Sequence, residues 1–310
     1  MIRGLFMKIL DIPRELTSYE FYSNVLPKIM LAEENKIILD MSYTQSIESL
    51  VIPNLLCCAY KIRLNYNKIC LFIPDTITGG ILRNYLNEIG FTKCAQYFDL
   101  IDFMYDPFSG LDGKHIDPIC NTLVLNANDS KDDIYRGVEL CINPFSDVYL
   151  SKFQLYDSTQ EKYINEITEF LEEILLNSKI HGRSFSITTL HANYSSKKIY
   201  ISVSDLGCGF INSLKGIRIK DEKEAILLGV YKRKDNKVYG LFNVIRRVLE
   251  YGGRVRIHSN NTQIIFTPRI LNAFMYGKLN SVKSFTKYNL KQTVQYDGVH
   301  IEIELPFEKG

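Results

Sequence analysis

The chain has 310 residues, and its 37 Lys and Arg against 35 Asp and Glu leave a formal charge of +2. This near balance excludes a protein built mainly to coat nucleic acid, because such proteins carry a large excess of basic residues to neutralise phosphates. With 46% hydrophobic and 23% charged residues, the composition excludes intrinsic disorder, and the length favours two domains.

Short β-like runs alternate with helical patterns over the first ~105 residues. The strand-like runs are 7–12, 36–41 and 68–74. Alternation of this kind predicts parallel strands joined by crossover helices, and the apolar, β-branched strands indicate a sheet covered on both faces. Residues 106–118 are rich in Asp, Gly and Pro, which favour turns and indicate a linker. We therefore predict an α/β domain at 1–110 and a second domain at 111–310.

The second domain begins with a strand-like run at 122–126 and two helical segments, the longer at about 160–181. In the longer segment apolar residues recur at spacings of three and four, as expected of a helix packed on a sheet. Another helix opens near residue 240. The remaining strand-like runs are 184–194, 198–207, 254–259, 262–267 and 300–307. We predict an α+β domain with helices on one face of a mainly antiparallel sheet.

Three polar residues of the long helix, Glu173, Asn177 and His181, are four residues apart and form one ridge beside the apolar stripe. An amide oxygen is a suitable hard ligand for magnesium, and a carboxylate one turn away can orient or deprotonate a nucleophile. Taken alone, so short a pattern is matched easily by solvated helix residues.

A second group of residues, Asp205, Gly207 and Gly209, follows directly after a predicted strand. The glycines let the backbone pass close to a flat ligand, and the carboxylate can accept a hydrogen bond from an exocyclic amine such as that of adenine. The alternative is an ordinary strand-ending turn. The chain contains neither a dinucleotide-binding GxGxxG fingerprint opening a helix nor a P-loop.

Gly240 opens a predicted helix, where free N–H groups and the helix dipole favour a phosphate. The preceding stretch, 215–237, is rich in Lys and Arg and includes Lys232. It is either a lid over phosphates or a solvated charged loop.

Four segments of the second domain, taken in order, resemble the motifs of the Bergerat-fold ATPases over about residues 120–310. EILLNSKIHG resembles the N box, SDLGCG the DxGxG box, AILLGVYKRK the entry to the lid, and YGLFNVIRRVLEYGG the second glycine box. That superfamily includes gyrase and histidine kinases, and the spacing is closest to its anti-sigma-factor serine kinases. The resemblance implies a Bergerat ATP-binding sandwich that uses ATP and magnesium.

By the same resemblance, Glu173 is the general base and Asn177 the magnesium ligand, while Asp205 reads adenine. The other nucleotide-binding residues that it implies are His181, Gly207, Gly209, Lys232, Gly240 and Leu241. The second glycine box departs from the family pattern, with Val238 and Phe242 in place of glycines, and Val299 stands where a Thr is common. These departures affect turnover more than nucleotide binding.

The N-terminal domain resembles an anti-sigma-factor antagonist (STAS) domain in the run IILDMSYTQSIESLVIPNLL. In that family a serine in the loop before the helix is phosphorylated by a partner kinase. Here Leu50 occupies the corresponding position, and the neighbouring Ser49 is the remaining candidate.

Together these patterns favour a regulator that binds ATP and magnesium, with ATPase or protein serine kinase activity, whose nucleotide state controls an interface with a protein partner. The alternatives are a nucleotide-gated binding module without hydrolysis and an atypical histidine kinase, which is disfavoured because no helical hairpin with an acceptor His precedes the ATP domain. A basic insert at 269–291 is either a solvated excursion, which we favour, or a contact for a partner or nucleic acid. The oligomeric state stays open, a homodimer included.

The scattered cysteines, without CxxC spacing, favour reduced thiols, and the start of the chain lacks the features of a secretion signal. No apolar run reaches the ~20 residues that a membrane span requires. We expect a cytoplasmic protein without a membrane contact.

Overall fold

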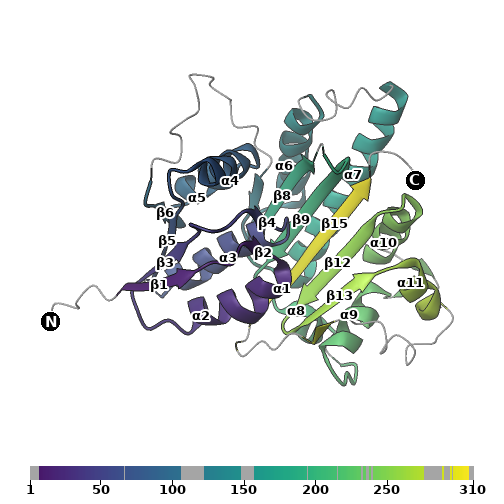
Figure 1. The fold of residues 1–310 in the computed structure, drawn as a ribbon. Helices are drawn as coiled ribbons and strands as arrows, with labels where there is room; N and C mark the ends of the chain where they lie inside the picture. The colour runs from purple at the N-terminus through teal and green to yellow at the C-terminus, as the bar shows by residue number, and fades with distance from the viewer. Residues whose placement is uncertain are drawn as a thin grey trace.

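The computed structural model is mixed α/β, with a four-stranded parallel sheet, a seven-stranded antiparallel sheet and two short two-stranded sheets, one of them formed by the parallel strands β2 and β4 (Figure 1). The structure describes residues 7–65, 67–105, 122–147, 157–193, 195–214, 216–231, 233–234, 237–238, 240–275, 288–289, 294 and 296–306. We call residues 7–105 the N-terminal part and residues 122–306 the C-terminal part. The predicted linker at 106–118 lies outside the described residues, as does most of the basic insert at 269–291.

The N-terminal part contains a four-stranded sheet in the order β1-β3-β5-β6, with all neighbouring strands parallel. Its elements are β1 (Met7–Asp11), β2 (Glu15–Leu16), α1 (Ser18–Glu20), the π-helical turn η1 (Phe21–Val25), α2 (Leu26–Met30), β3 (Lys36–Asp40), β4 (Ser46–Ile47), α3 (Val51–Arg63), β5 (Lys68–Phe72), α4 (Ile77–Glu88), α5 (Phe91–Tyr97) and β6 (Ile101–Phe103).

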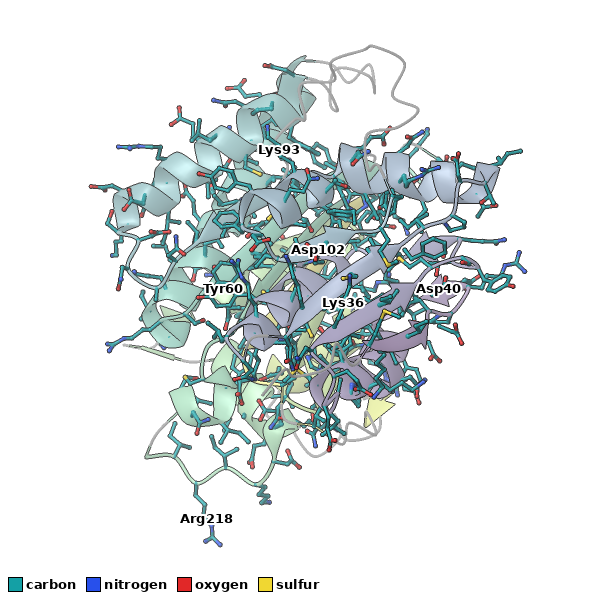
Figure 2. All side chains as sticks on the ribbon, turned by 90° about the vertical axis from the view of Figure 1, so that its left-hand side faces the viewer. Lys36, Asp40, Tyr60, Lys93, Asp102 and Arg218 are labelled. Carbon is teal, nitrogen blue, oxygen red and sulfur yellow. The ribbon has the colours of Figure 1, made fainter. Side chains whose placement is uncertain are left out.

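Described helices cover one face of this sheet, so the prediction of a sheet covered on both faces is wrong for the described residues. The chain moves in one direction across the sheet, from β1 to β6, and right-handed crossovers then place every connecting helix on the same side. Leu10, Leu39 and Leu71 point into that helical core. The opposite face is turned toward the viewer in Figure 2.

The C-terminal part is built on a seven-stranded sheet in the order β14-β13-β12-β15-β9-β8-β7, in which every neighbouring pair is antiparallel. Its strands are β7 (Thr122–Leu125), β8 (Ser186–Asn193), β9 (Lys198–Asp205), β12 (Arg254–Ser259), β13 (Thr262–Phe266), β14 (Tyr288–Asn289) and β15 (Val299–Pro306), with the two-stranded β10 (Arg233–Lys234) and β11 (Lys237–Val238) forming a separate ribbon.

Helices of the C-terminal part pack on one face of the seven-stranded sheet, as predicted. They are α6 (Lys131–Phe145), α7 (Asp157–Asn177), the π-helical turn η4 (Ser178–Gly182), α8 (Gly209–Ser213), α9 (Glu222–Val230), α10 (Leu241–Glu250) and α11 (Pro268–Met275). Several begin at side-chain caps, which satisfy the free N–H groups of the first turn. Ser130 and Asp133 form a capping box at α6, and Asp221 accepts from Glu224 N at 2.8 Å at α9.

The second face of the seven-stranded sheet is covered by the N-terminal part, chiefly by α3, which lies against β8 and β9 (Figure 1). Polar side chains occupy this face and make buried contacts across it. Asn54 Nδ2 donates to Ser204 Oγ at 2.8 Å, and Glu302 accepts from Leu50 N at 3.0 Å. The two parts are therefore joined by these polar contacts and also by apolar packing, because Phe185, Ile187 and Tyr296 of the C-terminal part belong to the apolar core of the N-terminal part.

No helix in the described part of the chain is long and apolar enough to cross a membrane. Every cysteine that the structure describes is a free thiol, and Cys208 is exposed while the others are buried.

Candidate functional site

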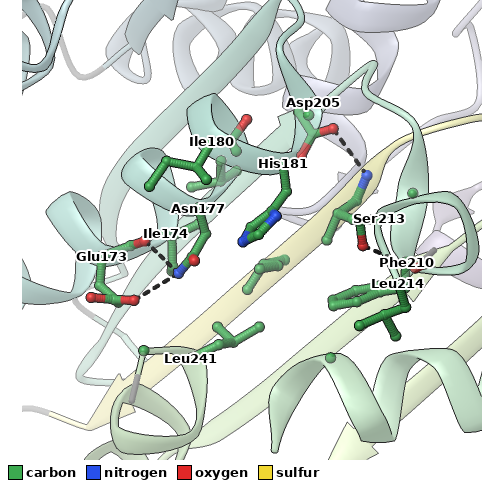
Figure 3. A pocket seen from close by; sticks show the side chains of 18 residues that line it. Glu173, Ile174, Asn177, Ile180, His181, Asp205, Phe210, Ser213, Leu214 and Leu241 are labelled. Atoms are coloured by element: carbon green, nitrogen blue, oxygen red, sulfur yellow. Dashed lines mark hydrogen bonds between the residues drawn. The ribbon is translucent and has the colours of Figure 1, made fainter. Parts of the chain in front are cut away.

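A cavity of about 670 Å³ lies between the helices and the seven-stranded sheet (Figure 3). This volume is within the roughly 300–1,000 Å³ typical of ligand sites. Apolar side chains form most of the walls, and a few polar groups are placed among them. The lining residues are Glu173, Ile174, Asn177, Ser178, Ile180, His181, Gly182, Val203, Asp205, Gly209, Phe210, Ser213, Leu214, Gly229, Gly240, Leu241, Val299 and Ile301.

Glu173 and Asn177 form a hydrogen-bonded pair on the last turn of α7. Asn177 Nδ2 donates both to the Glu173 backbone carbonyl and to Glu173 Oε1, each at 2.7 Å. These bonds hold the two side chains together, as residues four apart on a helix can be held. Because both bonds use the amide nitrogen, the amide oxygen Oδ1 is the atom of Asn177 that can ligate a cation.

The helix changes character immediately after this pair. The sequence predicts one helix to about residue 181, and the chain is helical to Gly182. The α-helix α7 itself ends at Asn177, however, and the next five residues form the π-helical turn η4. Such turns are frequent at functional sites because they redirect side chains. The His181 ring points into the cavity between Asn177 and Asp205 (Figure 3), and its backbone carbonyl accepts from Cys208 Sγ at 3.2 Å.

Asp205, the last residue of β9, lies at the opposite end of the cavity from Glu173 (Figure 3) and is 4% exposed. Its Oδ1 accepts from Gly207 N at 2.8 Å and from Val299 N at 3.3 Å. Burial raises the pKa of this carboxyl to about 6, and the two backbone donors and the Ser178 hydroxyl oppose the rise. At neutral pH the group is therefore mostly ionised and acts as a hydrogen-bond acceptor.

Two glycines permit contacts that no other residue allows. A Cβ on Gly207 would lie 2.4 Å from Gly182 Cα, so the chain after Asp205 passes directly over the end of η4. Gly240 has φ +70 and ψ −134, and its Cβ would lie 2.6 Å from Glu173 Oε1. The N-terminus of α10 is thereby brought against the Glu173 carboxylate.

The structure gathers most of the predicted site residues around this cavity. Those that line it are Glu173, Asn177, His181, Asp205, Gly209, Gly240 and Leu241. Gly207 lies behind the lining, against Asp205 and Gly182. Lys232 lies outside the described residues, so its predicted role has no structural description.

Sequence reasoning missed several lining residues. Gly182 and Ser178 line the cavity and belong to the same segment as Asn177. The only sequence signal for them is that they lie close to Asn177 and His181 in the chain. Phe210, Val299 and Ile301 line the cavity as well, and their apolar side chains are indistinguishable in sequence from ordinary core residues.

Ser49, the candidate phosphorylation position, lies outside the cavity. It is 6% exposed, and its Oγ is 2.7 Å from Ser202 Oγ on β9. Successive residues of a strand point to opposite faces of a sheet. Ser202 therefore faces the N-terminal part, while Val203 and Asp205 face the cavity. In this arrangement Ser49 and the cavity are separated by the sheet.

Among the described residues, no group of three or more His, Cys, Asp and Glu side chains could hold a metal ion. No protein-family model and no curated protein sequence matches this chain.

Proposed function

We propose that the C-terminal part is a Bergerat-type sandwich whose cavity binds ATP with magnesium, and that the N-terminal part is a STAS-like domain. The observation that carries the nucleotide proposal is the placement of the Glu173–Asn177 pair and of Asp205 at the two ends of one cavity of about 670 Å³. These residues come from different elements, α7 and β9, and only folding brings them together.

Each end of the cavity suits one end of the nucleotide. Asp205 can accept the exocyclic amine of adenine, with Val203 and Ile301 from the sheet as apolar neighbours of the base. The phosphates would lie toward Gly240, where the first N–H groups of the ten-residue α10 and its dipole favour an anion.

Asn177 fits the part of a magnesium ligand, because its Oδ1 is a hard oxygen and both of its described hydrogen bonds use Nδ2. When bound with phosphate oxygens, magnesium would neutralise their charge. A site of this kind uses few protein ligands, because phosphates and water complete the coordination.

Glu173 is the residue proposed to act in chemistry, by accepting a proton from water or from a hydroxyl during attack on the terminal phosphate. Its bond to Asn177 and its contact with Gly240 fix the carboxylate beside the proposed phosphate position. The activity would be ATP hydrolysis or transfer to a serine. Because the sheet separates Ser49 from the cavity, transfer to Ser49 within one chain is not part of the proposal.

The test is a comparison of Glu173→Gln with Glu172→Gln, a neighbour on the same helix that does not line the cavity. The amide oxygen introduced by Glu173→Gln can still accept the Asn177 bond, so ATP affinity should change little, while loss of the base should lower turnover by about 100-fold or more. Glu172→Gln should retain wild-type turnover. Equal turnover in all three proteins would contradict the role of Glu173. ATP binding without turnover in the wild type would instead favour the non-hydrolysing module.

The same strands connect the cavity to the interface between the two parts. On β9, Val203 and Asp205 face the cavity while Ser202 and Ser204 contact α3 and the loop before it. On β15, Ile301 faces the cavity while Glu302 bonds to Leu50 N. A ligand that moves these strands would therefore act directly on the interface between the two parts of the chain.

A further inference from the structure

The outer face of the four-stranded parallel sheet is the feature that the proposed nucleotide function does not use. Strands of a parallel sheet are usually covered on both faces, because they have little polar surface to offer to water. Here the helices of the N-terminal part pack on the inner face, and Met7 and Ile9 on the outer face are 52% and 57% exposed.

The strand register shows which side chains share the outer face, since paired residues of parallel strands point the same way. Three rows cross the sheet. The first row is Met7, Lys36 and Lys68, the middle row is Ile9, Ile38, Cys70 and Asp102, and the third row is Asp11, Asp40 and Phe72. Ile38 and Cys70 belong to neither of the two apolar cores, and both are buried, at 5% and 0% exposed, with Lys36, Lys68 and Asp102 beside the Cys70 thiol.

The charges on this face are segregated along the strand direction. Lysines stand in the first row, aspartates stand in the third, and the middle row is mainly apolar. Lys68 already pairs within the chain, with Asp99 at 3.0 Å and Asp102 at 2.7 Å. Asp40 Oδ1 accepts from Ser42 N at 2.9 Å. Lys36, Asp40 and Asp102 are all seen on the side turned toward the viewer in Figure 2.

This pattern is complementary to itself. A two-fold axis that runs across the strands through the middle row exchanges the first and third rows. Lys36 of one copy then faces Asp40 of the other, and the symmetry creates that pair twice, while the exposed Ile9 meets its own copy. A two-fold axis along the strands would instead oppose like charges, which is unfavourable. A symmetric dimer needs a surface that matches itself in this way.

We propose that this face is a dimerisation surface whose occupant is a second copy of the same chain, with strands of the two sheets running antiparallel. With strands about 4.8 Å apart and a rise of about 3.3 Å per residue, the four-stranded face spans roughly 19 by 17 Å. That footprint is smaller than the ~800 Å² per partner of a standard stable interface. The dimer is therefore weak and depends on protein concentration.

The experiment is sedimentation velocity on the full chain, over about 5 to 500 µM at low salt, with the variants Lys36→Glu and Asp40→Lys. Wild type should shift from monomer to dimer as concentration rises. Each variant opposes like charges in both symmetry-related pairs and should weaken the dimer at least tenfold. Thermal unfolding of each variant shows whether the chain still folds.

The decisive measurement is sedimentation of a mixture of the two variants. In a mixed dimer the glutamate of Lys36→Glu faces the lysine of Asp40→Lys, and the second pair keeps its original Asp40 and Lys36, so both pairs again join opposite charges. An equimolar mixture, and also the Lys36→Glu/Asp40→Lys double variant, should dimerise about as strongly as wild type. A wild type that stays monomeric throughout, a dimer unaffected by Lys36→Glu, or a mixture that fails to restore the dimer from folded variants would each overturn the proposal.

Discussion

At Asp205, ligand binding and stability make opposite demands on one residue. The carboxyl is 4% exposed, and burial raises its pKa to about 6 from the ordinary 3.8. The native state therefore binds this proton more tightly than the unfolded chain does, and ionisation at neutral pH destabilises the fold. A buried charge that opposes folding is typical of a functional position.

The stability prediction concerns Asp205→Asn. An amide can keep the oxygen that accepts from Gly207 N and Val299 N, and it carries no charge to desolvate. Between pH 3.8 and about 6 the native carboxyl retains a proton that the unfolded chain has released, so wild-type stability falls as pH rises through this window. Above it, Asp205→Asn should be more stable than wild type, by up to about 3 kcal/mol.

The measurement is urea unfolding of both proteins at pH 4.5, 5.5, 6.5 and 7.5. The difference in unfolding free energy should grow in favour of Asp205→Asn up to about pH 6.5 and then level off. A difference that shrinks as pH rises, or a variant less stable than wild type at pH 7.5, would contradict the assigned environment of this carboxyl.

The candidate site could be predicted residue by residue only at polar residues and within the glycine-containing segments that supply Gly209, Gly240 and Leu241. Glu173, Asn177, His181 and Asp205 were found because polar groups at fixed spacing stand out within apolar segments, and all four line the cavity. The apolar lining residue Ile301 was not found, since in sequence it cannot be distinguished from Ile303 and Leu305 on the same face of the strand.

At the scale of elements, the N-terminus of α10 depends on a conformation that only glycine adopts readily. Gly240 combines positive φ with a close approach to Glu173 Oε1, whereas Gly252, at the other end of α10, has φ +76 and nothing within 4 Å of its ideal Cβ position. Gly240 also has ψ −134, which together with its positive φ lies in a region that is almost exclusive to glycine.

We predict that Gly240→Ala lowers the free energy of unfolding by about 2 to 3 kcal/mol, because its φ and ψ are strained for any residue with a Cβ, and that the Glu173 carboxylate shifts to make room. Gly252→Ala should cost only about 1 kcal/mol, the strain of a positive φ. Chemical denaturation measures both, and ATP turnover should fall in Gly240→Ala but not in Gly252→Ala. Equal costs for the two variants would contradict the backbone strain assigned to Gly240.

Most elements could be predicted from periodicity, because apolar patterns differ between strands and helices. The short α5 and β6 were missed, since seven- and three-residue elements carry too few positions to show a period. The π-helical turn η4 was also missed, because its sequence, SKIHG, fits an α-helix equally well. The uncovered face of the parallel sheet follows from strand order, which local sequence does not specify.

At the scale of the whole molecule, a buried ionic cluster joins the two parts. Arg256 on β12 donates to Ser18 Oγ at 2.8 Å and to Glu48 Oε2 at 2.7 Å, both in the N-terminal part, and lies 3.6 Å from Glu302. Burial raises the pKa of Glu302, and Arg256 opposes that rise. Beside this cluster Tyr22 stacks on His258, with ring centroids 3.5 Å apart.

Removal of the Arg256 charge should be costly, because Glu302 would remain buried without the cation that opposes the rise in its pKa most strongly. We expect Arg256→Met to lower the free energy of unfolding by about 3 to 5 kcal/mol. Arg254→Met is the matched control on the same strand and face, and it should cost less than about 1 kcal/mol because Arg254 is half exposed.

Adding Glu302→Gln to Arg256→Met should recover part of the loss, since Gln removes the uncompensated charge and can still accept from Leu50 N. Urea unfolding of the single and double variants gives these differences. A double variant less stable than Arg256→Met alone would contradict the electrostatic account of the interface.

The central claim, that the cavity binds ATP through Asp205, is tested most directly by isothermal titration calorimetry with ATP and magnesium at pH 7.5. The proteins compared are wild type, Asp205→Asn and a control, Asp132→Asn, which makes the same substitution at an exposed position in the first turn of α6. We predict that wild type and Asp132→Asn bind alike, and that Asp205→Asn binds about 10- to 100-fold more weakly although it is at least as stable. No binding by wild type, or equal affinity in Asp205→Asn, would contradict the claim.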